Sequence, residues 1–180
     1  MLTRSPQLRD ALATAQRSLD HPPASWLAEP PAGLHPLHAE TRLPGGVALA
    51  DAGAALLSWD VHRGAGLRVE ADGPARVGGT VVVAVRLGPL WAVAPCRVVE
   101  VVDEPGRVGF AYATLPGHPE LGVERFTFED VGDGVRFEVD AVSRPALWAS
   151  RVAPAVAKRV QASVTARYLA AAAACVSRTT

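Results

Sequence analysis

Apolar positions follow a helical period near both ends of the chain and an alternating period between them. Within residues 8–19, leucine and alanine recur every three or four positions, which predicts a short amphipathic helix. The tandem prolines at 22–23 end this helix because proline has no backbone N–H to donate. Residues 21–36 are rich in proline and form an irregular arm, after which we expect a strand over residues 34–43 and a helix over residues 47–58.

From Gly79 onward the apolar period changes to two, which is typical of strands with one buried face. Glu104-Pro105-Gly106-Arg107 suits a tight turn with glycine in the left-handed region, and Asp133-Gly134 suits a hairpin. These turns separate strands that follow one another along the chain, which predicts an antiparallel meander. Its five strands are expected over residues 80–87, 95–102, 107–115, 123–130 and 135–143.

Beyond Arg144-Pro145 the pattern returns to a helix, expected over roughly residues 154–175. Its valines lie four residues apart, so Val156, Val160 and Val164 should face the sheet, whereas Lys158 and Arg178 should be exposed. A curved sheet and one long helix bury both apolar faces best when the sheet wraps the helix. The sequence thus predicts an α+β helix-grip fold: a curved antiparallel sheet around a long C-terminal helix, with a cavity between them.

Composition narrows the classes of partner. The 180 residues include 18 Lys+Arg and 18 Asp+Glu, so the formal net charge is zero and a nucleic-acid partner is not expected. No apolar run approaches the ~20 residues that span a bilayer, so we expect no integral membrane association. Residues 1–10 are polar where a signal peptide has an apolar core, which predicts a cytoplasmic protein.

Neither a metal nor another cofactor is expected from the sequence. Cys96 and Cys175 lie far apart without a CxxC motif, which argues against a disulfide framework and a structural zinc site. His35 and His38 are three apart on an extended segment, so they should point to opposite faces. Gly64-Ala65-Gly66 lacks the spacing of a phosphate-binding loop.

Glu124 is the first candidate for chemistry. Strand alternation places it on the same face as Phe126 and Phe128. A carboxylate against an apolar wall loses hydration, so its pKa rises and it becomes a candidate general acid or base. The alternative is a structural ion pair with Arg97, Arg125 or Arg144 at the sheet edge, which would lower that pKa.

The loop over residues 115–120, which ends at Glu120, holds a second candidate. Its two prolines and one glycine can fix His118 at a cavity rim, where imidazole could move a proton or bind a polar group. His118 could equally hydrogen-bond the backbone and only shape the loop. Tyr112 and Thr114 precede this loop on one face and could offer hydroxyls to a ligand, although Tyr112 could also be a core aromatic.

Five separated motifs, in this order, resemble the DUF1990 (UPF0548) family over about residues 30–172: PAGLH at 31–35, WDVHRGAG at 59–66, CRVV at 96–99, GFAYATLPGHPE at 109–120 and SRP at 143–145. The resemblance implies the START-like SRPBCC (Bet v 1-like) superfamily, whose members hold apolar ligands in a helix-grip cavity. Two positions depart from the family pattern, Ala113 in place of glycine and Val123 in place of the first of two glutamates. If that first acid takes part in chemistry, this chain has lost it.

We expect an N-terminal helix and proline-rich arm over residues 1–33 and a single helix-grip domain over residues 34–176. The favoured hypothesis is binding of a small apolar or amphipathic molecule in the cavity. Expected ligand contacts are Trp59, His62, Tyr112, Thr114, His118, Glu120, Phe126, Phe128 and Arg144.

Two other functions fit the same sequence. An enzyme of cyclase, dehydratase or hydrolase type would use His118, Glu124 and Tyr112 for acid/base chemistry. A protein-interaction module would instead dock through the 21–36 arm and an exposed Trp26. An open pocket containing Glu124 and His118 would favour the enzyme, whereas a sealed core with Glu124 paired outside it would favour the interaction module.

Overall fold

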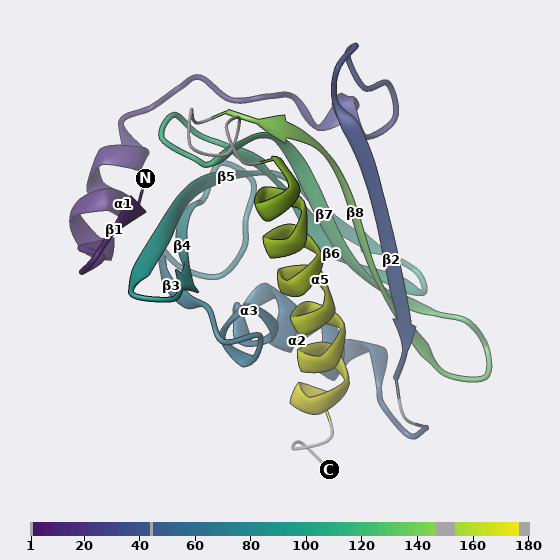
Figure 1. Ribbon diagram of the computed structural model, residues 1–180. Helices are drawn as coiled ribbons and strands as arrows, with labels where there is room; N and C mark the ends of the chain where they lie inside the picture. Colours follow the sequence, from purple (N-terminus) through teal and green to yellow (C-terminus); the bar gives the residue numbers. More distant parts are fainter. Residues whose placement is uncertain (1, 44, 147–153, 177–180) are drawn as a thin grey trace.

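The computed structural model describes residues 2–43, 45–146 and 154–176. An antiparallel sheet dominates it, with strand order β2-β8-β7-β6-β5-β4-β3 and with β1 paired to β5 (Figure 1). The strands are β1 (Leu2–Thr3), β2 (His35–Arg42), β3 (Arg68–Ala71), β4 (Thr80–Leu87), β5 (Leu90–Glu104), β6 (Arg107–Thr114), β7 (Glu120–Asp130) and β8 (Val135–Pro145). The helices are α1 (Leu8–Gln16), η1 (Ala24–Leu27), α2 (Leu49–Leu57), α3 (Asp60–Gly64) and α5 (Pro154–Val176).

The predicted meander is confirmed, because β4 to β8 pair in chain order and every pair is antiparallel. Gly106 lies between β5 and β6 with φ +80°, the left-handed value expected for that turn. Only β4 has the predicted bounds, and two strands begin at least three residues earlier than predicted. β5 begins at Leu90 and β7 begins at Glu120. β5 also contains a bulge at Val99, which has no partner on β6 between the pairs Val98–Tyr112 and Glu100–Ala111. Such an extra residue bends a strand and helps the sheet to curve.

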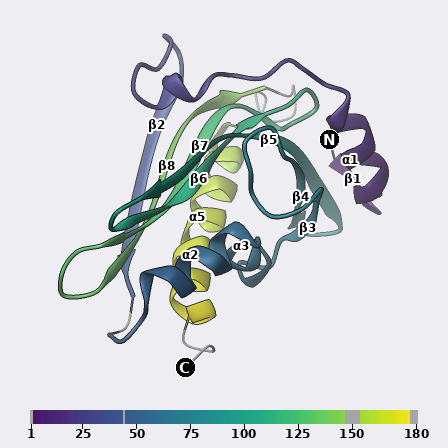
Figure 2. The ribbon, with the colours of Figure 1, turned by 180° about the vertical axis from the view of Figure 1, so that it is seen from behind.

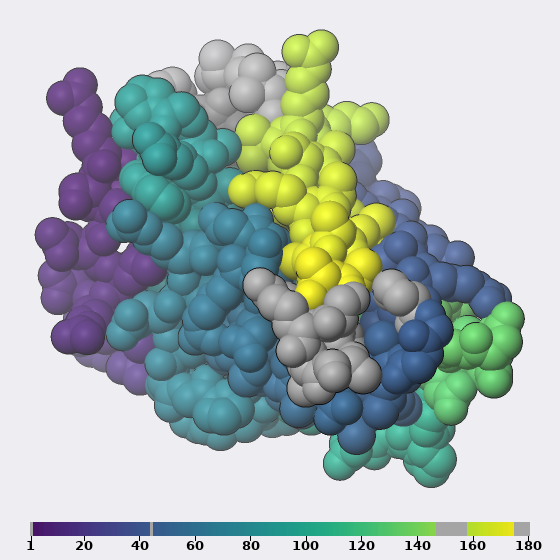
Figure 3. All heavy atoms as spheres, turned by 90° about the horizontal axis from the view of Figure 1, so that it is seen from below, coloured from purple at the N-terminus to yellow at the C-terminus, as the bar shows by residue number. Residues whose placement is uncertain are grey.

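The curved sheet encloses α5, as Figures 1 and 2 show from opposite sides. Helices α2 and α3 pack against the C-terminal part of α5 and close one end of the concave face. Seen from below, α5 fills the open side between β2 and the β3–β4 region (Figure 3). The helix-grip architecture predicted from the sequence is therefore confirmed.

The predicted orientation of α5 can be checked at three of its side chains. Val160 and Val164 point into the space between helix and sheet, and Lys158 is exposed, as expected. The side chain of Val156 and the whole of Arg178 lie outside the described residues.

The N-terminal segment packs on the outside of the sheet. Ala15 of α1 is buried against Val82 and Val93, and the Arg97 guanidinium donates hydrogen bonds to the carbonyls of Ala15 and Ser18 at 3.2 and 2.9 Å. Trp26 of η1 packs on a separate outer cluster formed by Ala111, Ala113, Val123 and Val142. The expectation that Trp26 is exposed is wrong, because this apolar patch on the convex face covers part of its ring.

Candidate functional site

The concave face of the sheet has two halves of different character. One half, here called the aromatic core, is filled by large rings from the sheet, from α3 and the residue before it, and from α5, namely Trp59, His62, Phe110, Phe126, Phe128, Phe137 and Tyr168. The other half, beside the N-terminal part of α5, contains a cavity of about 270 Å³. Tyr112 and Tyr168 belong to the border between them, since each contacts Phe126 and also lines the cavity.

Side-chain size along the strands explains this division. On β7 the inward positions change from Gly122 and Glu124 to Phe126 and Phe128. The neighbouring strand changes in the same direction, because Ser143 and Ala141 lie opposite Gly122 and Glu124, whereas Val139 and Phe137 lie opposite the two phenylalanines. Three of the four positions in one half are thus small, namely Gly122, Ser143 and Ala141, whereas the other half has two phenylalanines opposite Val139 and Phe137.

Glu124 lies at the border, where it meets Tyr112. The two residues are cross-strand partners, and the Tyr112 hydroxyl donates a hydrogen bond to Glu124 Oε2 at 2.8 Å. Burial raises the pKa of Glu124 to about 7, an effect that the Tyr112 hydrogen bond opposes and repulsion from Glu120 adds to. Burial likewise raises the pKa of Tyr112 well above its ordinary value, so Tyr112 stays a donor at neutral pH.

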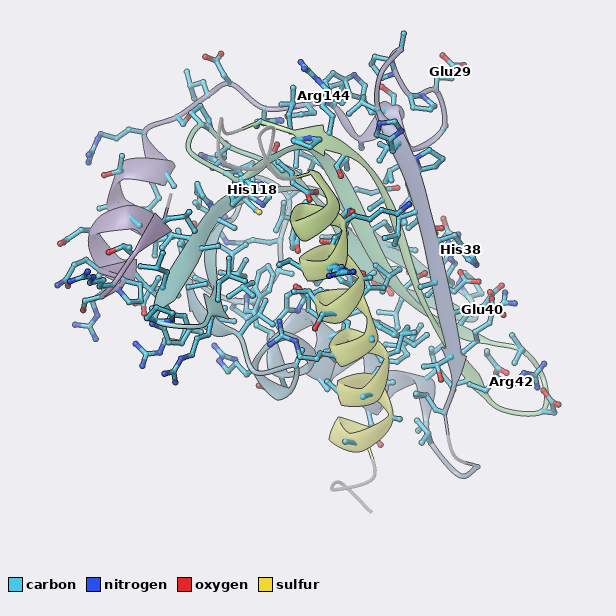
Figure 4. All side chains as sticks on the ribbon, in the orientation of Figure 1. Glu29, His38, Glu40, Arg42, His118 and Arg144 are labelled. Atoms are coloured by element: carbon cyan, nitrogen blue, oxygen red, sulfur yellow. The ribbon has the colours of Figure 1, made fainter. Side chains whose placement is uncertain are left out.

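The structure decides between the two interpretations of Glu124. Arg125 pairs instead with Glu100, at 2.7 Å between Nη2 and Oε2, and Arg97 bonds backbone carbonyls near α1. Arg144 is exposed at the end of β8 (Figure 4). Glu124 is therefore the desolvated carboxyl of the first interpretation, and its pKa is raised rather than lowered.

A second carboxyl, Glu120, lines the same cavity at the start of β7. The Ser143 hydroxyl donates a hydrogen bond to Glu120 Oε2 at 2.7 Å, and Gln161 Nε2 of α5 lies 3.4 Å from the same hydroxyl oxygen. Burial raises the pKa of Glu120, although the hydrogen bond from Ser143 opposes that shift. Glu120 and Glu124 therefore form the acidic part of the cavity wall.

His118 is held by the backbone of the loop. Its Nδ1 lies 2.8 Å from the carbonyl oxygen and 2.9 Å from the amide nitrogen of Glu120. Burial lowers the pKa of His118 to about 4, so the imidazole is neutral at pH 7. The ring lies near the start of α5 (Figure 4), in a wall that the cavity shares with a hollow bounded by Pro22 and Trp26. His118 thus both hydrogen-bonds the backbone of its own loop and lines the cavity.

Of the residues expected to contact a ligand, the structure brings together Tyr112, Thr114, His118 and Glu120 around the cavity. The Thr114 hydroxyl oxygen accepts a hydrogen bond from the Gly122 amide at 3.1 Å, which ties β6 to β7. The remaining expected contacts, Trp59, His62, Phe126, Phe128 and Arg144, are absent from the described cavity lining.

Packing explains why Trp59 and His62 do not reach the cavity. Trp59 adopts φ +69°, unusual for a non-glycine residue, and its indole Nε1 donates to the Gly73 carbonyl at 2.9 Å. His62 is fully buried among aromatic rings, and neither ring nitrogen has a hydrogen-bond partner among the described residues. Burial lowers the pKa of His62 to about 3. These two residues, like Phe126 and Phe128, complete the aromatic core.

Several cavity residues were not identified from the sequence. Strand alternation on β8 places Ser143 on the same face as Ala141, so its position on the cavity side could have been predicted. Its hydrogen bond to Glu120 could not. Gln161 and Thr165 follow Val160 and Val164 on α5 and line the cavity beside them. Their position depends on the rotation of the helix, which the apolar stripe defines only approximately.

The side chains of the two departures from the family pattern pack in the outer cluster, although Val123 also borders the cavity. Ala113 and Val123 are cross-strand partners, and both are buried in the outer cluster beneath η1. Strand alternation puts a side chain at position 123 on the face opposite Glu124. An acid at that position would therefore face η1 and not join the two carboxyls of the cavity.

The described residues contain no cluster of three or more His, Cys, Asp or Glu side chains arranged to hold a metal ion. Within the same part of the chain, no helix is both long enough and apolar enough to cross a membrane.

Solved structures with the same arrangement share little sequence with this chain. The di-domain ARO/CYC protein StfQ from the steffimycin biosynthetic pathway matches with a TM-score of 0.61 and 13% identity, over 81% of this chain and 52% of that one. TTHA0849 from Thermus thermophilus matches with a TM-score of 0.59 and 12% identity, over 81% and 99% of the two chains. An uncharacterised protein from Rhizobium leguminosarum matches with a TM-score of 0.56 and 19% identity, over 81% of this chain and 95% of that one. These structures show the same fold as this chain, a curved antiparallel sheet around a long C-terminal helix.

Sequence comparison gives the family. A UPF0548 protein from Deinococcus radiodurans is 46% identical over 119 residues, which are 59% of this chain and 60% of that protein. The chain thus spans about three fifths of the length of this curated relative. A family model described as a domain of unknown function (DUF1990) matches residues 20–171. Because that match includes most of the sheet and most of α5, the chain belongs to the DUF1990 family.

Proposed function

We propose that this protein binds a small apolar or amphipathic molecule in the cavity between the sheet and α5. The observation that carries the proposal is the composition of the cavity wall, which is mostly aliphatic but has polar groups around Tyr112, Glu124 and Glu120. An apolar pocket with a few convergent polar groups is the usual form of a small-molecule site. The occurrence of an ARO/CYC protein of a biosynthetic pathway among the structural neighbours supports a small organic molecule as the class of ligand.

Native mass spectrometry of the protein purified from its own cells tests this proposal. The control is Ala141→Leu, because Ala141 lines the cavity directly opposite Glu124 and a leucine there occupies ligand space. The wild type is expected to carry an additional small-molecule mass that the Ala141→Leu variant lacks. An identical retained mass in both proteins, or no binding of any apolar compound by the wild type in a screen, would contradict the proposal.

An enzyme with acid/base chemistry is the second candidate, and the Tyr112–Glu124 pair favours it. A carboxyl with a pKa of about 7 exchanges its proton readily near neutral pH, and the cavity gives a ligand access to it. Glu124 and His118 also line the same cavity, which is the arrangement expected of an enzyme on this scaffold. Incubating the retained molecule with wild type and with Glu124→Gln tests this candidate, since only the wild type should convert it to a new mass. Conversion at equal rates by both proteins would exclude Glu124 from the chemistry.

A further inference from the structure

The cavity wall contains two acidic side chains, and its described residues include no lysine or arginine. Glu120 and Glu124 lie on the same face of β7, and repulsion from Glu120 is one cause of the raised pKa of Glu124. The positive charge of the chain's N-terminus influences the pKa of His118, but no positive charge is among the causes that shift either carboxyl. Within the part of the chain that the structure describes, the acidic end of the cavity therefore lacks a counter-ion.

Two arginines on the strands that carry the cavity have other partners. Arg97 bonds the carbonyls of Ala15 and Ser18 on the convex side, and Arg125 pairs with Glu100. On α5, Lys158 and Arg159 are exposed to solvent. The charge of Arg167 opposes the rise in the pKa of Tyr168, but Arg167 does not line the cavity and is not a cause of the shift of either carboxyl. The missing positive charge is thus not supplied by a described neighbouring side chain.

We propose that the cavity ligand is an amphipathic cation, whose protonated amine lies against Glu124 and Glu120 and whose apolar body lies along the aliphatic wall. This inference rests on the function proposed above and adds the charge of the ligand's head group. The aliphatic wall is formed by side chains such as Val83, Val85 and Val160.

Electrostatics favours this class over the two alternatives. A carboxylate or phosphate ligand would bring a further negative charge beside two acids in a region of low dielectric constant, where like charges repel strongly. A neutral ligand would leave an ionised Glu124 without compensation, and a buried unpaired charge is costly. An ammonium group gives each carboxyl a charge-assisted hydrogen bond, and the rings of Tyr112 and Tyr168 that line the cavity can contribute cation–π attraction.

Isothermal titration calorimetry with three probes of equal chain length separates these classes. The probes are n-octylamine, n-octanol and n-octanoate, which are cationic, neutral and anionic at pH 8. We expect n-octylamine to bind at least about tenfold more tightly than n-octanol, and n-octanoate to bind more weakly than both. Equal affinities for the amine and the alcohol, or preference for n-octanoate, would overturn the cation inference while leaving the proposed function in place. Failure of all three probes would overturn both.

Substitutions locate the preference at the acids. Glu124→Gln keeps an acceptor for the Tyr112 hydroxyl but removes the charge, so n-octylamine affinity should fall about tenfold while n-octanol affinity stays within about twofold. Glu104→Gln, an exposed acid at the end of β5, is the matched control and should change neither affinity. Loss of amine affinity in Glu104→Gln, or its retention in Glu124→Gln, would contradict the assignment.

The pH dependence gives an independent measurement. The titratable groups beside Glu124 are Tyr112 on β6, Cys96 on β5, Glu120 on β7 and Tyr168 on α5. The pKa values of both tyrosines and the cysteine are raised well above neutral, and the cavity-lining His118 has a pKa of about 4. An alkylamine remains protonated to about pH 10, so the carboxyls Glu124 and Glu120 are the groups whose charge can change between pH 6 and 8, and the Glu124→Gln variant isolates the first of them. Affinity for n-octylamine should rise about tenfold across that interval in the wild type and stay flat in Glu124→Gln. A flat wild-type profile would contradict the inference.

Discussion

The aromatic core and the cavity are formed by successive residue pairs of the same two strands, β7 and β8, yet the aromatic core is filled by side chains and the cavity is not. Phe126 lies opposite Val139 and is fully buried, whereas Glu124, two residues earlier, lies opposite Ala141 and faces open space. Strand alternation directs both side chains inward, so alternation alone does not distinguish core from site. The difference comes from side-chain volume and from the polar groups retained where volume is small.

The two halves also shift the pKa values of their buried ionisable groups in opposite directions. His62 in the aromatic core has a pKa lowered to about 3, while Glu124 at the cavity has a pKa raised to about 7. Burial is the main cause in both cases, because it disfavours whichever form carries charge. His62 is neutral at any pH near 7 and has no described partner to exchange a proton with, whereas Glu124 titrates near neutrality beside a cavity. Of these two buried groups, only Glu124 can therefore exchange its proton with a molecule in the cavity near pH 7.

The largest expected effect is the difference in stability lost when a side chain is truncated in the aromatic core and in the cavity wall. Phe126→Ala should lower the free energy of unfolding by about 3–5 kcal/mol, because it removes a ring packed against Phe110, Phe137 and Tyr168. Val160→Ala in the cavity wall should cost only about 1 kcal/mol, since its side chain already borders empty space. Urea denaturation measures both, and equal costs would contradict the division of the concave face.

Glu124→Gln should stabilise the empty protein at alkaline pH. A carboxyl whose folded pKa is about 7, against an ordinary 4.5, favours the folded state below pH 4.5 and loses that contribution as pH rises through 7. Removing its charge should therefore raise the free energy of unfolding by about 2–3 kcal/mol at pH 8 and by less than about 1 kcal/mol at pH 5. Chemical denaturation at both pH values checks this. A gain that is equal at pH 5 and pH 8 would show that Glu124 is not desolvated.

His62 should make the fold sensitive to acid, in the opposite sense to Glu124. Its folded pKa of about 3 lies below the ordinary 6.5, so the unfolded chain binds the extra proton and stability falls as pH decreases from 6.5 towards 3. From pH 7 to pH 5 this group alone should cost roughly 2 kcal/mol, and His62→Phe should remove that share of the loss. His118, with a folded pKa of about 4, contributes in the same direction and remains in the variant. Equal acid sensitivity of wild type and His62→Phe would contradict the prediction.

The smallest effect compares added volume in the two halves. Val139→Leu enlarges a side chain in the filled aromatic core and should cost about 1 kcal/mol through overpacking. Ala141→Leu adds more atoms but directs them into the cavity, so it should change stability by less than about 1 kcal/mol while weakening ligand binding. Thermal denaturation of the two variants measures the contrast. A larger loss in Ala141→Leu than in Val139→Leu would indicate that the cavity is not open space.

Much of the fold follows from local pattern, but the boundary of the site does not. Alternation correctly placed Glu124, Phe126 and Phe128 on one face, and the return to a helical period located α5. Nothing local indicated that the wall changes from small to large residues between Glu124 and Phe126, because that depends on the register with β8. The short strands β1 and β3 were missed because pairing with β5 and β4, rather than their own composition, makes them strands.

His62 is a second position whose surroundings the local sequence does not determine. The sequence offered a histidine near a tryptophan and two glycines, which suits a ligand contact as well as a core position. Its burial is decided by α3 docking against α5, which places the ring beside Phe126 and Tyr168. Only contacts between distant segments distinguish a buried histidine from a functional one.

Methyl-resolved NMR with a neutral probe tests most directly whether one half of the concave face binds ligands and the other does not. On titration with n-octanol, the methyl signals of Ala94, Ala141 and Val85 in the cavity wall should shift, while those of Val61 and Val139 in the aromatic core should not. Shifts confined to the first group, and abolished by Ala141→Leu, are the predicted result. Shifts of equal size in both groups, or only at exposed residues of the convex face, would contradict the account.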